Sequence, residues 1–231
     1  MFKAIPSQRT STLIKILLAI FVLLLPSCKT GQSLTNKEAQ TFQLKKILFL
    51  PFKDMYAIYG NNAYFRCPLS GKVSIVGKVA EGANDFMTAK LISLFKSHKN
   101  YSLIPPERAE NVLAKLLLKN KQELSDLDFL IQAGQALKAD GVMLGRLYRF
   151  EKRIGKKYSI QSPASVSFDL LLIRVADSRI LWSGKFDETQ RSLSENLFQI
   201  SAFLKRKGRW VTAEEMASSG LEDLLKIFFK S

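Results

Sequence analysis

The sequence predicts an α/β (α+β) domain in which helices pack on a mixed sheet of about four to five strands. Two observations support this fold class. Short apolar runs of strand length are interspersed with stretches whose apolar residues recur at helical spacing, and the strands fall into an early and a late group. The composition, with 47% hydrophobic and 24% charged residues, is that of a globular chain with its own core.

The amino-terminal half contributes the first strands and three helices. Residues 44–52 contain an apolar run that predicts a buried strand, residues 84–96 predict a helix, and residues 101–104 predict a short strand. The next helix begins near Pro106, with proline and an acid in its first turn. A further helix begins at Ser125 and Asp128 and is ended by Ala139, Asp140 and Gly141.

Three strands follow in the second half. Residues 142–150 predict a strand. Its alternate residues, which include Phe150, form an apolar face that Arg146 interrupts. Residues 165–172 alternate apolar side chains with polar ones, a pattern typical of a half-buried strand. The polar positions are Ser165, Ser167 and Asp169. Asp177 and Ser178 then turn the chain into a strand through Trp182, which predicts a hairpin.

Two helices are expected at the carboxyl end. Residues 193–204 carry a helical stripe and are followed by a basic group, Lys205, Arg206, Lys207 and Arg209. The second helix begins at Thr212, which forms a capping box with Glu215. By contrast, residues 53–79 show little regular pattern apart from a short strand at 73–76. Long irregular segments of this kind are often functional or mobile.

The amino terminus predicts a secretory leader. Residues 1–15 hold three positive charges and no negative ones, and residues 16–25 are uniformly apolar but too short to span a bilayer core of about 30 Å. Leu25, Ser27 and Cys28 follow. This site resembles the lipobox of bacterial lipoproteins, which implies cleavage before Cys28 and acylation of its thiol. The alternative is an ordinary signal peptide with a chance cysteine.

These features predict a division into a leader at 1–27, a flexible tether at 28–43 and one domain at 44–231. Acyl chains on Cys28 would hold the protein to a membrane. Lys29 follows the cysteine, and the sorting preference of lipoproteins then favours the outer membrane, with the domain facing the periplasm. The sequence leaves the oligomeric state open.

No catalytic constellation is visible. The single histidine, His98, stands among lysines at a helix end, so it predicts a surface residue and not a triad member. Phosphate loops, dinucleotide fingerprints and metal-ligand clusters are missing. We therefore expect no enzyme activity, no cofactor and no metal, while a hydrolase with an unrecognised pair of acids is the alternative.

The net charge of +15 favours anionic partners. Nucleic acid is not expected, because a secreted protein is kept apart from it. A basic segment forms the candidate partner-binding site: Arg149, Lys152, Arg153, Lys156 and Lys157. Together with Arg146 it could bind an anionic ligand, and the alternative is a solvated basic face. Cys67 is expected to be a buried thiol of no special reactivity.

The layout resembles a group of envelope lipoproteins that includes penicillin-binding-protein activators, curli-secretion lipoproteins and the TolB amino-terminal domain. The features that carry the resemblance are the early strand at 47–52, the helix and strand at 86–104, the run Ala139 to Gly145, and the hairpin around Asp177. The resemblance implies an accessory or assembly role exercised by binding another envelope protein. Auxiliary lipoproteins of envelope lipid transporters have a similar hairpin and are the alternative. The segment from Tyr56 to Lys78 has no counterpart in the pattern. Together with the basic hairpin at 149–157, it is the expected contact surface for a partner.

The lipid anchor can be tested on the protein purified from its native membrane. We expect the intact mass to fit residues 28–231 plus acyl chains, and the acyl mass to be lost in a Cys28→Ala variant. An unmodified mass, or a chain found entirely in the soluble fraction, would contradict lipidation.

Overall fold

A computed structural model describes residues 44–98, 101–119, 125–155, 160–190 and 210–230. The leader, Cys28 and the tether lie outside these ranges. So do the helix expected at 193–204, the basic group that follows it, and Lys156 and Lys157. The predictions made for those positions therefore stay predictions.

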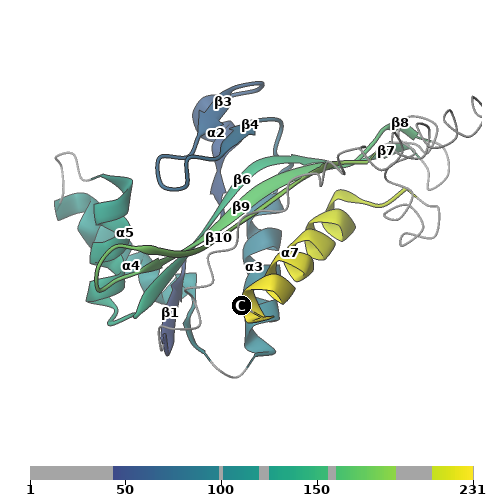
Figure 1. Cartoon of the computed structure of the whole chain (residues 1–231). Coiled ribbons are helices and arrows are strands. Elements are labelled where there is room, and N and C mark those ends of the chain that lie inside the picture. Colours follow the sequence, from purple (N-terminus) through teal and green to yellow (C-terminus); the bar gives the residue numbers. More distant parts are fainter. Residues whose placement is uncertain (1–43, 99–100, 120–124, 156–159, 191–209, 231) are drawn as a thin grey trace, which may run out of the picture. The chain divides into compact units, whose positions relative to one another are not determined.

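The centre of the fold is a six-stranded mixed sheet, which confirms the predicted fold class (Figure 1). Its strands run in the spatial order β10, β9, β6, β1, β5, and β2 pairs with β6 beyond the end of β1. The strands are β1 (Lys46–Phe49), β2 (Lys53–Asp54), β5 (Ser102–Ile104), β6 (Gly141–Glu151), β9 (Ser165–Arg174) and β10 (Ile180–Thr189). The pairs β6–β9 and β9–β10 are antiparallel, whereas β1 and β2 are parallel to β6.

One edge of β6 is shared by two short strands. Phe49 of β1 pairs with Met143, and Lys53 of β2 pairs with Arg146. The connection between them folds the Phe52 ring over Gly145, where a Cβ atom would lie 2.7 Å from that ring. Glycine is therefore required at this close approach, and it lets β2 rejoin the sheet after β1 has ended.

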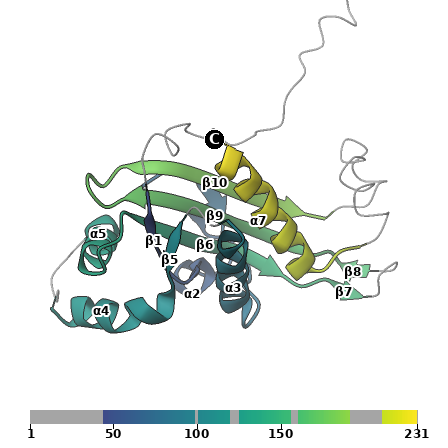
Figure 2. The same cartoon turned by 90° about the horizontal axis from the view of Figure 1, so that it is seen from below.

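Helices cover both faces of the sheet. On one face, α3 (Ala83–Lys96) and α7 (Ala213–Lys230) lie side by side and bury the larger hydrophobic core (Figures 1 and 2). On the other face, α4 (Pro106–Lys119) and α5 (Asp126–Ala136) bury a second core at one end. These four helices lie where the sequence predicted helices.

The segment 53–79, which was expected to be irregular, contains short strands and a short helix. It forms β2, then α2 (Met55–Tyr59), β3 (Tyr64–Arg66) and β4 (Val73–Ile75). The short strand expected at 73–76 is confirmed as β4, but α2 and β3 were not predicted. Each is too short to show a helical or alternating period in the sequence. A second small ribbon pairs β7 (Ile154–Gly155) with β8 (Ile160–Ser162).

The expectation that β9 is half-buried is wrong. Every residue from Ser165 to Ile173 is buried, including Ser167 and Asp169. The alternating polar residues do face away from the larger core, but α2, β3 and β4 lie over that face of the sheet (Figure 1). The polar face of β9 is therefore enclosed by protein instead of water.

Phe150 is also displaced from its expected face. The register of β6 against β9 shifts between Leu147 and Arg149, which places an extra residue in β6. A bulge reverses the alternation beyond it. Phe150 therefore joins the larger core with Leu147, while Tyr148 stays on the face that carries Arg146.

The capping box of α7 is confirmed. Thr212 Oγ1 accepts a hydrogen bond from the Glu215 amide at 3.1 Å, and Glu215 Oε2 accepts one from the Thr212 amide at 3.0 Å. Val211 and Met216 are both buried on either side of this cap, as a hydrophobic staple requires.

Replacing the capping hydroxyl should weaken the docking of α7. We expect Thr212→Ala to lower the free energy of unfolding by about 1 kcal/mol, because one amide at the helix start loses its acceptor. Thr212→Ser keeps the hydroxyl and is the matched control. Urea denaturation of both variants measures the difference, and equal midpoints would contradict the role of the cap.

Candidate functional site

A buried ion pair lies beneath the segment 53–79. The Arg146 guanidinium donates from Nε and Nη2 to the two carboxylate oxygens of Asp169, at 2.9 and 2.8 Å. Arg146 is 5% exposed and Asp169 is 2% exposed. The two residues face one another across the β6–β9 ladder, which brings the fork of the guanidinium onto the carboxylate.

Two further side chains complete this charged cluster. The Tyr148 hydroxyl donates to Asp169 at 2.9 Å, and Arg146 Nη2 donates to the Cys67 sulfur at 2.7 Å. Burial, followed by the negative charge of Asp169, raises the pKa of Tyr148 well above its ordinary value. Burial disfavours the charged form of Arg146, but its bonds to Asp169 outweigh this and raise its pKa. Tyr148 therefore keeps its proton and Arg146 keeps its charge at neutral pH.

The expectation for Cys67 as a buried thiol is confirmed, and the structure gives it a partner. It is fully buried at the start of a tight turn in which the Ser70 amide donates to its sulfur at 3.1 Å. Because Arg146 belongs to the sheet and Cys67 to the segment above it, this contact ties the two together.

Lysine side chains make further ties between β4 and the sheet. Lys72 donates to the Ser183 hydroxyl, and Lys185 donates to the Val73 carbonyl at 2.6 Å. Burial lowers the pKa of Lys72 from its ordinary value. The inner surface of the segment is thus anchored by polar contacts to both β6 and β10.

The outer surface of the same segment is apolar. Tyr64 pairs with Ile75 and Arg66 pairs with Val73 across the β3–β4 ribbon, so these four side chains share the face turned away from the sheet. We call this set the ribbon face. Tyr64 is 79% exposed, and Val73 and Ile75 are 44% and 45% exposed. The opposite face packs inward through Phe65, whose ring lies 5.7 Å from that of Tyr148.

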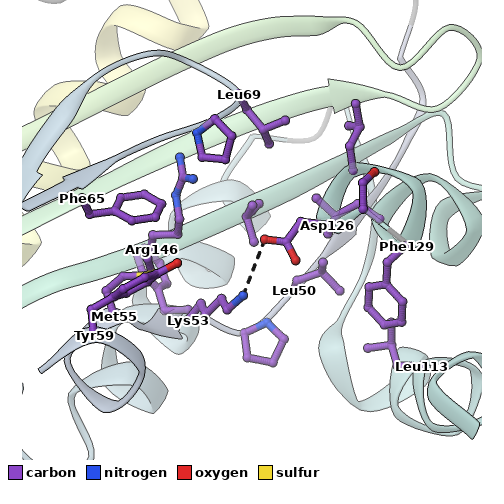
Figure 3. Close-up of a pocket in the computed structure, with 17 residues that line it drawn as sticks. Leu50, Lys53, Met55, Tyr59, Phe65, Leu69, Leu113, Asp126, Phe129 and Arg146 are labelled. Carbon is purple, nitrogen blue, oxygen red and sulfur yellow. Dashed lines mark ion pairs between the residues drawn. The ribbon is translucent and has the colours of Figure 1, made fainter. Parts of the chain in front are cut away.

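A pocket of about 590 Å³ opens between this segment and the helices α4 and α5. Figure 3 shows Tyr59 and Phe65 on one side of it and Leu113 and Phe129 on the other. Leu50 lies between the two walls. The Lys53 ammonium, from β2, lies 3.8 Å from the Asp126 carboxylate, in the first turn of α5, and both side chains are largely exposed.

The structure places three of the five candidate partner-binding residues. Arg149 donates to Asp187 at 2.7 Å and to the Ser165 hydroxyl, so its guanidinium is already engaged. Arg153 donates to the Trp210 carbonyl at 2.6 Å. Lys152 has a largely exposed side chain that lies 3.8 Å from Glu214. Lys156 and Lys157 lie outside the described residues.

His98 is exposed, as expected, and its ring stacks on Phe229 with centroids 3.6 Å apart. Over the described ranges, no group of three or more His, Cys, Asp or Glu side chains is placed to hold a metal ion. Within those same ranges, no helix is both long enough and apolar enough to cross a membrane.

Sequence reasoning singled out the segment 56–78 as a candidate contact surface, but it did not identify the ribbon face within it and it missed the pocket. Tyr64 and Ile75 stood in a segment without a period, so nothing indicated that they share a face. Lys53 and Asp126 are far apart in the chain, and only the fold brings them together. One signal was present: the isolated Arg146 within an apolar strand predicts a buried partner for its charge.

No family model and no curated protein matches the chain. Solved structures with a similar arrangement include the C-terminal domain of LpoB from Salmonella enterica, at 14% identity and a TM-score of 0.38 over 63% of this chain and 83% of that one. A lipoprotein from Neisseria meningitidis matches at 15% identity and a TM-score of 0.38, over 70% and 92% of the two chains. A hypothetical protein from Chlamydia trachomatis matches at 12% identity and a TM-score of 0.43, over 80% and 95%.

The Neisseria protein is a lipoprotein, which is the class of protein that the sequence resembles. Similarities at these TM-scores assign neither a family nor an activity to this chain.

The buried ion pair can be tested by removing one charge. We expect Asp169→Asn to lower the free energy of unfolding by about 3–5 kcal/mol, because Arg146 would remain charged and buried without a counter-ion. Asp187→Asn, which removes an exposed partner of Arg149, is the control and should cost about 1 kcal/mol or less. Similar losses in the two variants, measured by urea denaturation, would overturn the structural role of the pair.

Proposed function

We propose that this protein is a lipid-anchored accessory or assembly factor of the bacterial cell envelope that acts by binding another envelope protein. The leader and the lipobox-like site at Cys28 support the anchor, and they support a location of the domain on the periplasmic side of a membrane. The observation that carries the binding role is the ribbon face. No described group of side chains suggests a reaction.

The ribbon face has the properties of a protein contact. This face carries three of the eight large apolar side chains that are exposed among the described residues: Tyr64, Val73 and Ile75. Isolated exposed apolar residues are ordinary, but a concentration in one place marks an interaction surface. An aromatic residue and an arginine among aliphatic neighbours is also the composition found at the energetic centres of interfaces.

The segment is also rigid enough to act as a preformed surface. Its inner face is fixed by the bond from Arg146 to Cys67, by the bond from Lys185 to Val73 and by the packing of Phe65 on Tyr148. A surface that is ordered before binding loses less conformational entropy on association. The ribbon therefore presents its apolar side chains without having to fold on the partner.

The basic segment is proposed as a second contact. Lys152 has the most accessible charge among its three described members, while the guanidinium groups of Arg149 and Arg153 are held within the domain. A rim charge of this kind changes the rate of association more than the affinity. We therefore assign the ribbon face the larger share of the binding energy.

Crosslinking of the anchored protein in its native membrane tests the role of the ribbon. The variant Tyr64→Ser with Ile75→Ser should reduce recovery of the crosslinked partner about tenfold, as expected when residues at the centre of an interface are truncated. Leu118→Ser removes an equally exposed apolar side chain on α4 and is the matched control. Equal recovery from the two variants, or crosslinks from the ribbon to lipid alone, would contradict the proposal.

A further inference from the structure

The pocket beside the ribbon has a lining whose chemistry restricts what can occupy it. Its volume of about 590 Å³ lies within the range of small-molecule sites. Aliphatic and aromatic side chains from the sheet, from α4 and α5, and from the segment 53–69 form its walls. The charged and hydroxyl-bearing side chains that reach it are Lys53, Tyr59, Ser125, Asp126 and Arg146.

Two of these polar groups already make hydrogen bonds within the domain. Arg146 donates from Nε and Nη2 to Asp169 and Cys67. The Ser125 hydroxyl caps α5, accepting from the Asp128 amide at 3.2 Å and donating to its carboxylate. The walls are therefore largely apolar and offer few side-chain partners to a buried polar group.

This lining favours a hydrocarbon chain over a peptide. A peptide backbone buried in the pocket would bring amide and carbonyl groups that need hydrogen-bond partners, and leaving them unpaired is costly. An acyl chain has no such groups, and each methylene that leaves water adds to its affinity. A largely apolar pocket of this volume is suited to an alkyl tail.

The mouth carries one charge of each sign. Lys53 and Asp126 are 3.8 Å apart, with side-chain exposures of 47% and 80%, so their mutual attraction is weak and both remain accessible. A headgroup that contains a phosphate and an amine could pair with both at once. A purely anionic headgroup would gain the lysine but meet the repulsion of the carboxylate.

We propose that this pocket binds one acyl chain of a zwitterionic phospholipid, with the phosphate beside Lys53 and the amine beside Asp126. This site is separate from the ribbon face and goes beyond the proposed protein-binding role. A lipid bound there would adjoin the ribbon, because Tyr59 and Phe65 line the pocket and belong to the same segment.

Photolabelling in vesicles tests the site directly. The anchored full-length mature protein is reconstituted into phosphatidylcholine vesicles that contain a phosphatidylethanolamine with a diazirine in its acyl chain, and labelled peptides are mapped by mass spectrometry. We expect labels on peptides that contain Leu113, Phe129 or Leu69. Labelling confined to the region of Cys28 would overturn the proposal, since it would reflect the anchor alone.

Two blocking variants and one matched control separate binding from folding. Leu69→Arg places a charge in the wall and Leu113→Trp fills the space, and each should reduce pocket labelling about tenfold. Leu118→Arg carries the same charge on an exposed position of α4 outside the lining and should label normally. Denaturation midpoints identify a variant that has lost its fold. Normal labelling of a folded blocking variant would overturn the site.

The headgroup assignment has its own test. Replacing the probe by a phosphatidylglycerol with the same acyl diazirine should reduce pocket labelling about three- to fivefold, the effect of an exposed charge pair. In Asp126→Asn the two probes should label equally, because the carboxylate that distinguishes them is gone. Equal labelling by the two probes in the unmodified protein would overturn the zwitterionic assignment.

Discussion

The pairing of Arg146 with Asp169 determines how one side of this domain is built. An arginine in the middle of β6 and an aspartate in the middle of β9 face one another across the ladder, and both are withdrawn from water. Burying either charge alone would strongly destabilise the fold, whereas the two groups together form an ion pair with two hydrogen bonds. Tyr148 of β6 also donates to Asp169, and Arg146 donates to Cys67, which links the segment 53–79 to the sheet.

The segment consequently has two surfaces of different character. Its inner surface is polar where it meets the sheet and aromatic where Phe65 packs on Tyr148. The ribbon face, on the outer surface, carries Tyr64, Val73 and Ile75 into solvent. A segment that only shields a buried polar cluster from water would be expected to have a polar solvent-facing surface. Under the proposed binding role, the apolar side chains there would contact a partner, and the contacts of the inner surface would hold them in place for it.

The pocket arises from the same arrangement. The helices α4 and α5 cover one end of this sheet face, and α2 with the β3–β4 ribbon covers the other, so an apolar space remains between two covers that do not meet. The walls belong to different elements, whereas the floor is the connection from β1 to β2. A lipid-binding pocket and a protein-binding ribbon would therefore share the segment 53–79, and binding at one would then affect binding at the other.

The sequence by itself determined the elements whose signals are local. The helix begun by Thr212 and Glu215, the cap at Ser125, the turn at Asp177 and the mixed sheet follow from spacing and capping within a few residues. The tertiary structure alone decided which faces are covered. It buried the polar face of β9, moved Phe150 across the sheet through a bulge, and brought Lys53 next to Asp126. Burial and pairing depend on residues distant in the chain, so no local period can encode them.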